Sequence, residues 1–118
     1  MTIILKNKET LKFDDFYFKC TIGKKGLSFN KKEGDLKTPK GNFKIGNLYY
    51  RADRINKPLT KLKTIPIKKN MGWCNDPNSK NYNKLIKYPF NSTFEKLFRK
   101  DNIYDVIMVL NYNMKPVI

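Results

Sequence analysis

The stretch KEGDLKTPKGNF, residues 32–43, contains two tight turns that lead into a strand. In the first turn Gly34 can take a positive φ, and Asp35 can accept a hydrogen bond from the backbone two residues further on. In the second turn Pro39 fixes φ and Gly41 is free to enter the left-handed region. Two turns this close together predict a loop that is held against a β-sheet. Taken alone, the stretch also fits ordinary hairpin connections.

Strand and turn patterns dominate the rest of the chain. Alternating apolar residues predict strands over residues 2–5, 12–22, 27–29, 42–50 and 104–110, and a loop over 59–65 that ends in a short strand. Gly46 interrupts the alternation of its strand and predicts a bulge. Four consecutive apolar residues, 106–109, predict a final strand that is buried on both faces.

Two further segments differ from this strand pattern. Residues 75–83 are dense in Asn, Asp, Pro and Ser and predict an ordered surface loop. One short helix is expected over 94–99, because Ser92 or Thr93 can cap it and Glu95 lies in its first turn. The chain as a whole is therefore predicted to be all-β with one short helix.

Length and composition favour one domain, residues 1–118. A chain of 118 residues without a repeat, linker or charge block suits a single domain that buries about two-thirds of its unfolded surface. The hydrophobic fraction of 40% is adequate for a core, to which eight Phe, seven Tyr and one Trp contribute large areas.

The charge of the chain is strongly basic, with 25 Lys and Arg against 10 Asp and Glu, or +15. Such a field attracts nucleic acid, anionic lipid or acidic polymers. Readers of specific nucleic-acid sequences favour Arg, whereas nearly all of these cations are Lys. We therefore expect no specific nucleic-acid partner. A biased genome composition also explains the excess of Lys and Asn, and both explanations stay open.

The two cysteines, Cys20 and Cys74, form neither a disulfide framework nor a zinc site, since zinc needs clustered Cys or His ligands. A single bridge between them stays open. The apolar run in residues 1–6 is too short for a signal-peptide core, and no segment has the length of a membrane span. As written, the sequence is expected to be cytoplasmic.

Further sequence blocks surround the opening stretch. FKCTIGKKG (18–26) precedes it, and YYRADR (49–54), MGWCNDP (71–77), YNKLI (82–86), EKLFR (95–99) and YDVIMVL (104–110) follow. In this order and spacing the chain resembles the L,D-transpeptidase catalytic domain, in its YkuD-like branch, from about residue 20 to its end. The GWCNDP block is the most specific part. The resemblance implies a mixed β-sheet sandwich.

The resemblance also implies a function. The family cuts and rejoins the peptide stems of bacterial peptidoglycan through a cysteine acyl-enzyme, in the periplasm or cell envelope and without a cofactor. Its nucleophilic cysteine and the preceding histidine lie in the C-terminal part of the domain. This chain has no histidine and stops at Ile118. We therefore expect a domain truncated at its C-terminus, monomeric, that recognises peptide stems but has no catalytic residue and no activity alone.

Cys74 has a structural and a chemical interpretation. Acyl transfer by cysteine needs a thiolate, a base and donors for the oxyanion. A free thiol has a pKa near ~8.5, which a paired histidine lowers, and a neighbouring carboxylate such as Asp76 raises it instead. Cys74 is therefore expected to be a small buried residue, and Cys20 to lie in the core. A nucleophilic Cys74 is the alternative.

The candidate substrate-binding residues are Trp73, Asn75, Asp76, Tyr82 and Asn83, predicted to form the wall of a pocket. A lone Trp in a loop rich in side-chain amides offers a stacking surface and hydrogen bonds to a peptide or sugar. The alternative is that the Trp fills the core while the Asn and Asp residues shape turns.

Two open alternatives concern charge. Arg51 and Arg54 are candidates to bind a stem carboxylate, although they also fit a solvated strand end. The whole chain also fits a non-catalytic basic β domain that binds peptidoglycan or a polyanion, including nucleic acid with steep salt dependence.

Overall fold

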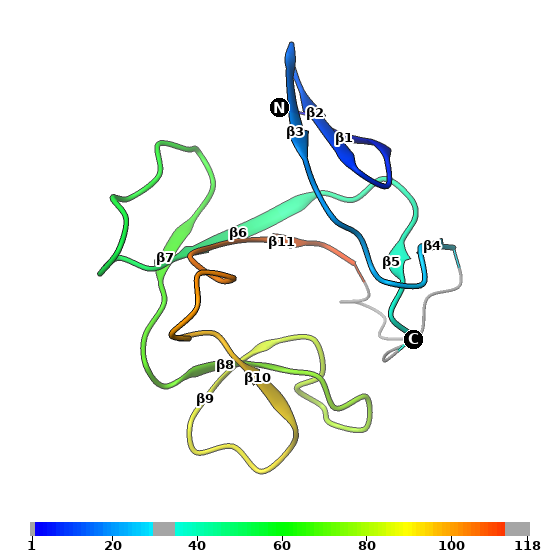
Figure 1. Ribbon diagram of the computed structural model, residues 1–118. Coiled ribbons are helices and arrows are strands. Elements are labelled where there is room, and N and C mark those ends of the chain that lie inside the picture. Colours follow the sequence, from blue (N-terminus) through cyan, green and yellow to red (C-terminus); the bar gives the residue numbers. More distant parts are fainter. Residues whose placement is uncertain (1, 30–34, 113–118) are drawn as a thin grey trace. The chain divides into compact units, whose positions relative to one another are not determined.

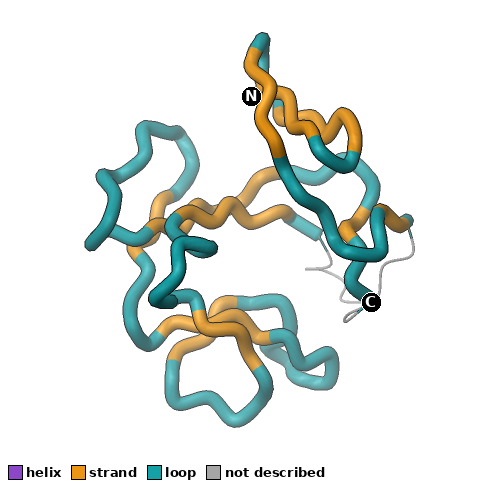
Figure 2. Tube along the Cα trace, viewed as in Figure 1, coloured by secondary structure: helices purple, strands orange, loops and turns teal. Residues whose placement is uncertain are grey.

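The computed structural model describes residues 2–29 and 35–112, and all regular structure in these ranges is β-strand (Figures 1 and 2). The all-β prediction is confirmed. No helix long and apolar enough to cross a membrane occurs in the described ranges. The chain divides into two compact units, residues 1–42 and 43–118. The two are described separately below, and the single-domain expectation stays a prediction.

The first unit begins with an antiparallel meander of β1 (Ile3–Asn7), β2 (Thr10–Phe13) and β3 (Phe16–Lys19). The single strand predicted over 12–22 is wrong, because Asp14 and Asp15 form a two-residue turn between β2 and β3. Asp14 has a φ of 50°. Tight hairpin turns favour positive φ, and Asp tolerates it better than most residues.

The opening stretch lies partly outside the described residues, because the turn predicted at Gly34 falls within residues 30–34. In its second part the turn predicted at residues 38–41 is wrong, because Thr38 and Pro39 form β5 (Thr38–Pro39), which pairs in parallel with β4 (Leu27–Ser28). Gly23 donates its backbone N–H to Thr38 Oγ1 at 2.7 Å. A Cβ on Gly23 would lie 2.5 Å from the backbone oxygen of Leu36, so only glycine allows this approach. Gly41 has a positive φ of 143°.

The second unit contains two three-stranded sheets (Figure 1). In the first, β6 (Ile45–Tyr50) pairs antiparallel with β11 (Val106–Leu110) and parallel with β7 (Thr64–Pro66), so this sheet is mixed. In the second, β8 (Met71–Cys74) is central and antiparallel to β9 (Leu85–Lys87) and β10 (Phe94–Lys96). Residues 75–83 form a turn-rich loop between β8 and β9, as predicted.

Two predictions about the second unit are wrong. The short helix expected over 94–99 is replaced by β10, because Phe94 pairs with Cys74 and its ring lies 4.9 Å from that of Tyr88. A six-residue helix has little intrinsic stability, so tertiary pairing overrides the capping signal. The final strand is not buried on both faces, because its residues alternate between exposed and partly buried. Val106 and Met108 are 46% and 41% exposed.

The core of the second unit joins its two sheets. Tyr49 from β6, Met71 from β8, and Ile67 and Leu97 from loops are buried together. Partly buried apolar side chains surround these four: Ile65, Trp73, Leu85, Phe98, Tyr104, Ile107 and Val109. The sheet formed by β6, β7 and β11 therefore packs against elements of the β8 sheet, and Trp73 lies at the edge of this core.

Candidate functional site

A bulge in β6 lies beside a cavity of the second unit. The pairing of β6 and β11 shifts register between Met108, which faces Leu48, and Leu110, which faces Ile45. Gly46 and Asn47 therefore both lie opposite the single residue Val109. This confirms the bulge predicted at Gly46. Bulges redirect side chains and occur often beside functional sites.

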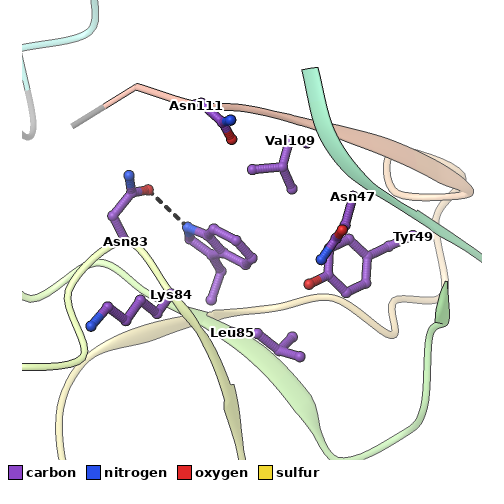
Figure 3. Close-up of a pocket in the computed structure, with 9 residues that line it drawn as sticks. Asn47, Tyr49, Asn83, Lys84, Leu85, Val109 and Asn111 are labelled. Carbon is purple, nitrogen blue, oxygen red and sulfur yellow. Dashed lines mark hydrogen bonds between the residues drawn. The ribbon is translucent and has the colours of Figure 1, made fainter. Parts of the chain in front are cut away.

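The pocket at this bulge has a volume of about 400 Å³ (Figure 3). It is lined by residues of β6, β8, β9, β11 and the loop before β9: Gly46, Asn47, Tyr49, Trp73, Asn83, Lys84, Leu85, Val109 and Asn111. Aromatic and aliphatic surface is combined with three side-chain amides. Such a lining suits an uncharged polar ligand with apolar parts.

Trp73 supplies the aromatic wall of the pocket. Its ring centroid lies 6.2 Å from that of Tyr49, with the two planes at 78°. Because side chains alternate along a strand, Gly72 and Cys74 lie on the opposite face of β8. A Cβ on Gly72 would lie 2.7 Å from the Phe94 ring, so this glycine allows β10 to approach the strand that presents Trp73.

Asn83 fixes the orientation of Trp73. The indole Nε1 donates to Asn83 Oδ1 at 3.0 Å (Figure 3). Asn83 Nδ2 donates to the backbone oxygen of Tyr112 at 2.8 Å. The backbone N–H of Asn83 donates to the oxygen of Cys74, and its φ is 58°. Asn is among the few residues that take this conformation readily. Both polar atoms of its side chain are therefore bonded within the protein.

Seven of the nine residues that line the pocket were not among the predicted site residues, and Asn47, Tyr49 and Asn111 are three of these seven. Asn47 and Tyr49 belong to β6, and Asn111 follows β11. The predicted bulge at Gly46 was the signal that could have identified Asn47. Asn111 had no such signal, because its position depends on the pairing of two strands about 60 residues apart in the chain.

The other three predicted site residues are not among those that line the pocket. Asp76 accepts the backbone N–H of Asn78 at 2.9 Å and so shapes the loop after β8. Asn75 is exposed and extends the backbone pairing with Thr93, while Tyr82 is buried. The structure thus brings Trp73 and Asn83 together in the pocket wall, and their role in binding stays a prediction.

The two cysteines are free thiols. Cys74 is 1% exposed, in agreement with the expectation of a small buried residue. Cys20 is only partly buried and follows the end of β3, so the expectation of a core position is wrong. No group of three or more His, Cys, Asp or Glu side chains that could bind a metal is found in the described part of the chain.

The arginine cluster lies elsewhere in the second unit and comprises Arg51, Arg54 and Arg99 with Asp53, Asp101 and Asp105. Arg51 is 3% exposed, and its guanidinium stacks 3.6 Å from the centroid of Phe98. It donates to both Asp53 oxygens at 2.8 Å and to the backbone oxygen of Arg99 at 2.6 Å. This hydrogen bonding lowers the pKa of Asp53.

Arg54 connects the same turn to the loop before β11. It donates to Asp105 Oδ1 at 2.7 Å and to the backbone oxygens of residues 99, 100 and 101. Tyr104, which lies in the same loop, donates a hydrogen bond from its phenol to the Glu95 carboxylate of β10. Burial is the larger cause of the raised pKa of Tyr104, and this hydrogen bond is the second. Arg51 and Arg54 therefore bind the protein itself, which argues against the stem-carboxylate interpretation.

Comparison with known proteins gives one result. The family model of the L,D-transpeptidase catalytic domain, YkuD, matches residues 1–106. This match includes residues 1–19, which the motif resemblance did not cover. No curated protein and no solved structure matches the chain. Since the matched residues make up most of the 118, the chain belongs to the L,D-transpeptidase catalytic domain family.

Proposed function

We propose that the chain binds the peptide stems of bacterial peptidoglycan in the pocket at the β6 bulge, and that residues 1–118 alone do not carry out transpeptidation. Family membership supports the choice of peptide stems as the ligand class. The single observation that carries the choice of site is the wall formed by Trp73 and Asn83, in which the indole is oriented by a hydrogen bond. A fixed aromatic face beside amide groups suits a peptide.

The position of Cys74 supports the proposed inactivity of these residues. At 1% exposure, on the face of β8 opposite to Trp73, the thiol is not presented to a ligand in the pocket. The chain contains no histidine to act as its base. An inert buried thiol is the ordinary state of a structural cysteine.

Turnover can be tested with purified protein, a tetrapeptide stem and a labelled D-amino acid. We expect no exchange of the terminal residue, since loss of a nucleophile and its base typically costs about 10⁴ to 10⁶ in rate. Exchange that is abolished by Cys74→Ala would show that Cys74 is the nucleophile. Exchange that survives this substitution would point to another group, and either result would contradict the proposed inactivity.

Binding can be followed through Trp73, which is the only tryptophan in the chain. Addition of a tetrapeptide stem should change its emission, and the affinity should vary little between 50 mM and 200 mM salt. The variant Leu85→Lys, which places a charge in the pocket, should bind weakly, whereas Leu59→Lys on an exposed loop should bind like the parent.

The competing interpretation is a basic domain that binds polyanions, supported by the net charge of +15. In that case the protein would bind purified bacterial cell-wall sacculi through the anionic polymers attached to them. Binding would fall steeply with salt, and Leu85→Lys would not weaken it. Loss of binding after removal of these polymers from sacculi would contradict the peptide-stem proposal.

A further inference from the structure

Two of the three side-chain amides in the pocket remain available to a ligand. Asn83 has both of its amide atoms bonded, to Trp73 and to Tyr112. By contrast, no hydrogen bond from the Asn47 or Asn111 side chain to a described residue is found. A side-chain amide carries one acceptor oxygen and two N–H donors, so these two residues offer both kinds of partner.

The backbone places both amides in the wall of the pocket. Asn47 belongs to the bulge of β6, Asn111 follows β11, and Val109 lies between them (Figure 3). The backbone N–H of Asn111 donates to the oxygen of Lys44 at 2.8 Å, which fixes its position beside β6. Gly46 provides the space for its side chain, because a Cβ there would lie 2.9 Å from Asn111 Oδ1.

The charged residue of the pocket lining is not directed at the two amides. Lys84 is the one charged residue among those that line it, and in Figure 3 its side chain runs away from Asn47 and Val109. A carboxylate only accepts hydrogen bonds and would gain most from a cation directed at it. A carboxamide both donates and accepts, and it therefore matches a pair of asparagine side chains.

We propose that Asn47 and Asn111 form an amide clamp that selects a ligand carrying an uncharged carboxamide over the same ligand carrying a free carboxylate. This inference rests on the proposed function, because it assigns the clamp to one group of a peptide stem. Asn47 and Asn111 are thereby specificity-determining residues, and Asn83 positions the indole without contacting the ligand through its side-chain amide.

The test uses two small probes that differ only at this group, N-acetyl-D-alaninamide and N-acetyl-D-alanine. Each probe is titrated into the protein while the fluorescence emission of Trp73 is recorded. The NMR signals of the backbone amides of residues 46, 47 and 111 are followed in the same titration. The amide probe can form two matched hydrogen bonds with the asparagine side chains, whereas the acid probe cannot. We therefore expect the protein to bind the amide probe about fivefold to tenfold more tightly. Equal affinities, a preference for the acid, or no binding of either probe would overturn the clamp.

Variants locate the preference in the structure. Asn47→Leu and Asn111→Leu remove the polar atoms at similar size, and the double variant should bind both probes equally. Gly46→Ala removes no polar group but displaces the Asn111 side chain, so it should reduce the preference about as much as Asn111→Leu. Asn56→Leu, at an exposed position outside the pocket, is the matched control and should keep the preference. A preference that persists in the double variant would contradict the clamp.

The outcomes for clamp and function are separable. Stem binding without discrimination between the two probes would leave the proposed function standing and overturn the clamp. Discrimination between the probes in a protein that does not bind stems would support the clamp and contradict the proposed function.

Discussion

The arginine cluster and the pocket lie in the same unit and use polar side chains in opposite ways. In the cluster, Arg51 and Arg54 donate to carboxylates and backbone oxygens of the protein itself. In the pocket, Asn83 is bonded internally, whereas Asn47 and Asn111 remain open. The difference separates residues that stabilise the fold from residues that can recognise a ligand. Substitutions in the two regions should therefore affect different measurements.

The largest effect on stability is expected from Arg51→Met. This change leaves the backbone oxygen of Arg99 and the Asp53 carboxylate without their guanidinium partner, at a position 3% exposed. Breaking one side of such an arrangement is strongly destabilising, and we expect the melting temperature to fall by roughly 10 °C. Circular dichroism in the far ultraviolet measures the transition.

Lys57→Met is the matched control for that substitution, since Lys57 is exposed in the adjacent loop. It should change the melting temperature by no more than about 2 °C. Equal losses of melting temperature for the two variants would mean that Arg51 contributes to stability only through its charge. The arginine cluster would then not differ from the pocket as a region that stabilises the fold.

Asn83→Ala comes next, with an expected loss of about 2 kcal/mol. The indole N–H and the Tyr112 oxygen each lose a partner, and alanine is disfavoured at a φ of 58°. Glycine in Asn83→Gly adopts the positive φ readily but makes neither hydrogen bond. This variant therefore separates the cost of the lost hydrogen bonds from the cost of the backbone conformation. Chemical denaturation gives the free energies, and Trp73 emission reports whether the indole still occupies one position. If the glycine variant were as stable as the parent, the hydrogen bonds would have no net value.

Much of the fold could be predicted from the sequence because its signals are local. The alternation in 42–50, the glycine at 46 and the dense turn residues of 75–83 each depend on a few neighbours and proved correct. Two of the failures were non-local. The cap-like Ser92 and Thr93 predicted a helix, but pairing of Phe94 with β8 decided the outcome. Apolar residues 106–109 predicted burial, but they alternate between exposed and partly buried, and which face of β11 is covered depends on elements distant in the chain.

The site was predictable to a smaller extent. Trp73 and Asn83 were found because an aromatic residue among amides is visible in sequence. Asn75 and Asp76 carry the same signal, yet Asp76 shapes a turn and Asn75 is exposed. Asn111 is brought to the pocket only by the pairing of β6 with β11, which no short sequence window contains.

The effect of pH on the arginine cluster should be smaller than that of Arg51→Met. Hydrogen bonding to Arg51 lowers the pKa of Asp53, and Arg99 lowers that of Asp101 in the same way. A carboxyl whose folded pKa lies below its unfolded value of about 3.9 stabilises the fold above that pH. This stabilisation is lost as the pH falls through the folded pKa. Melting temperatures should therefore drop below about pH 4.

Asp53→Asn tests the assignment of this pH dependence. The variant should melt below the parent at pH 6, and the difference should shrink as the pH falls through the folded pKa of Asp53, where the parent carboxyl becomes protonated. Asp15→Asn, on an exposed turn of the first unit, serves as the control and should follow the parent throughout. A difference in melting temperature between parent and Asp53→Asn that stays constant as the pH is lowered from 6 would show that the ion pair with Arg51 does not cause the pH dependence.

The smallest effect on stability is expected from Asn47→Ala, and it sharpens the contrast most. The Asn47 side chain makes no hydrogen bond to a described residue, so its loss should change the free energy of unfolding by less than about 0.5 kcal/mol. The same substitution should nevertheless weaken the binding of the amide probe about fivefold, because it removes one side of the clamp. Thermal denaturation and a probe titration on one protein preparation give both values. A large loss of stability with unchanged probe affinity would place Asn47 with the arginine cluster, among the residues that stabilise the fold.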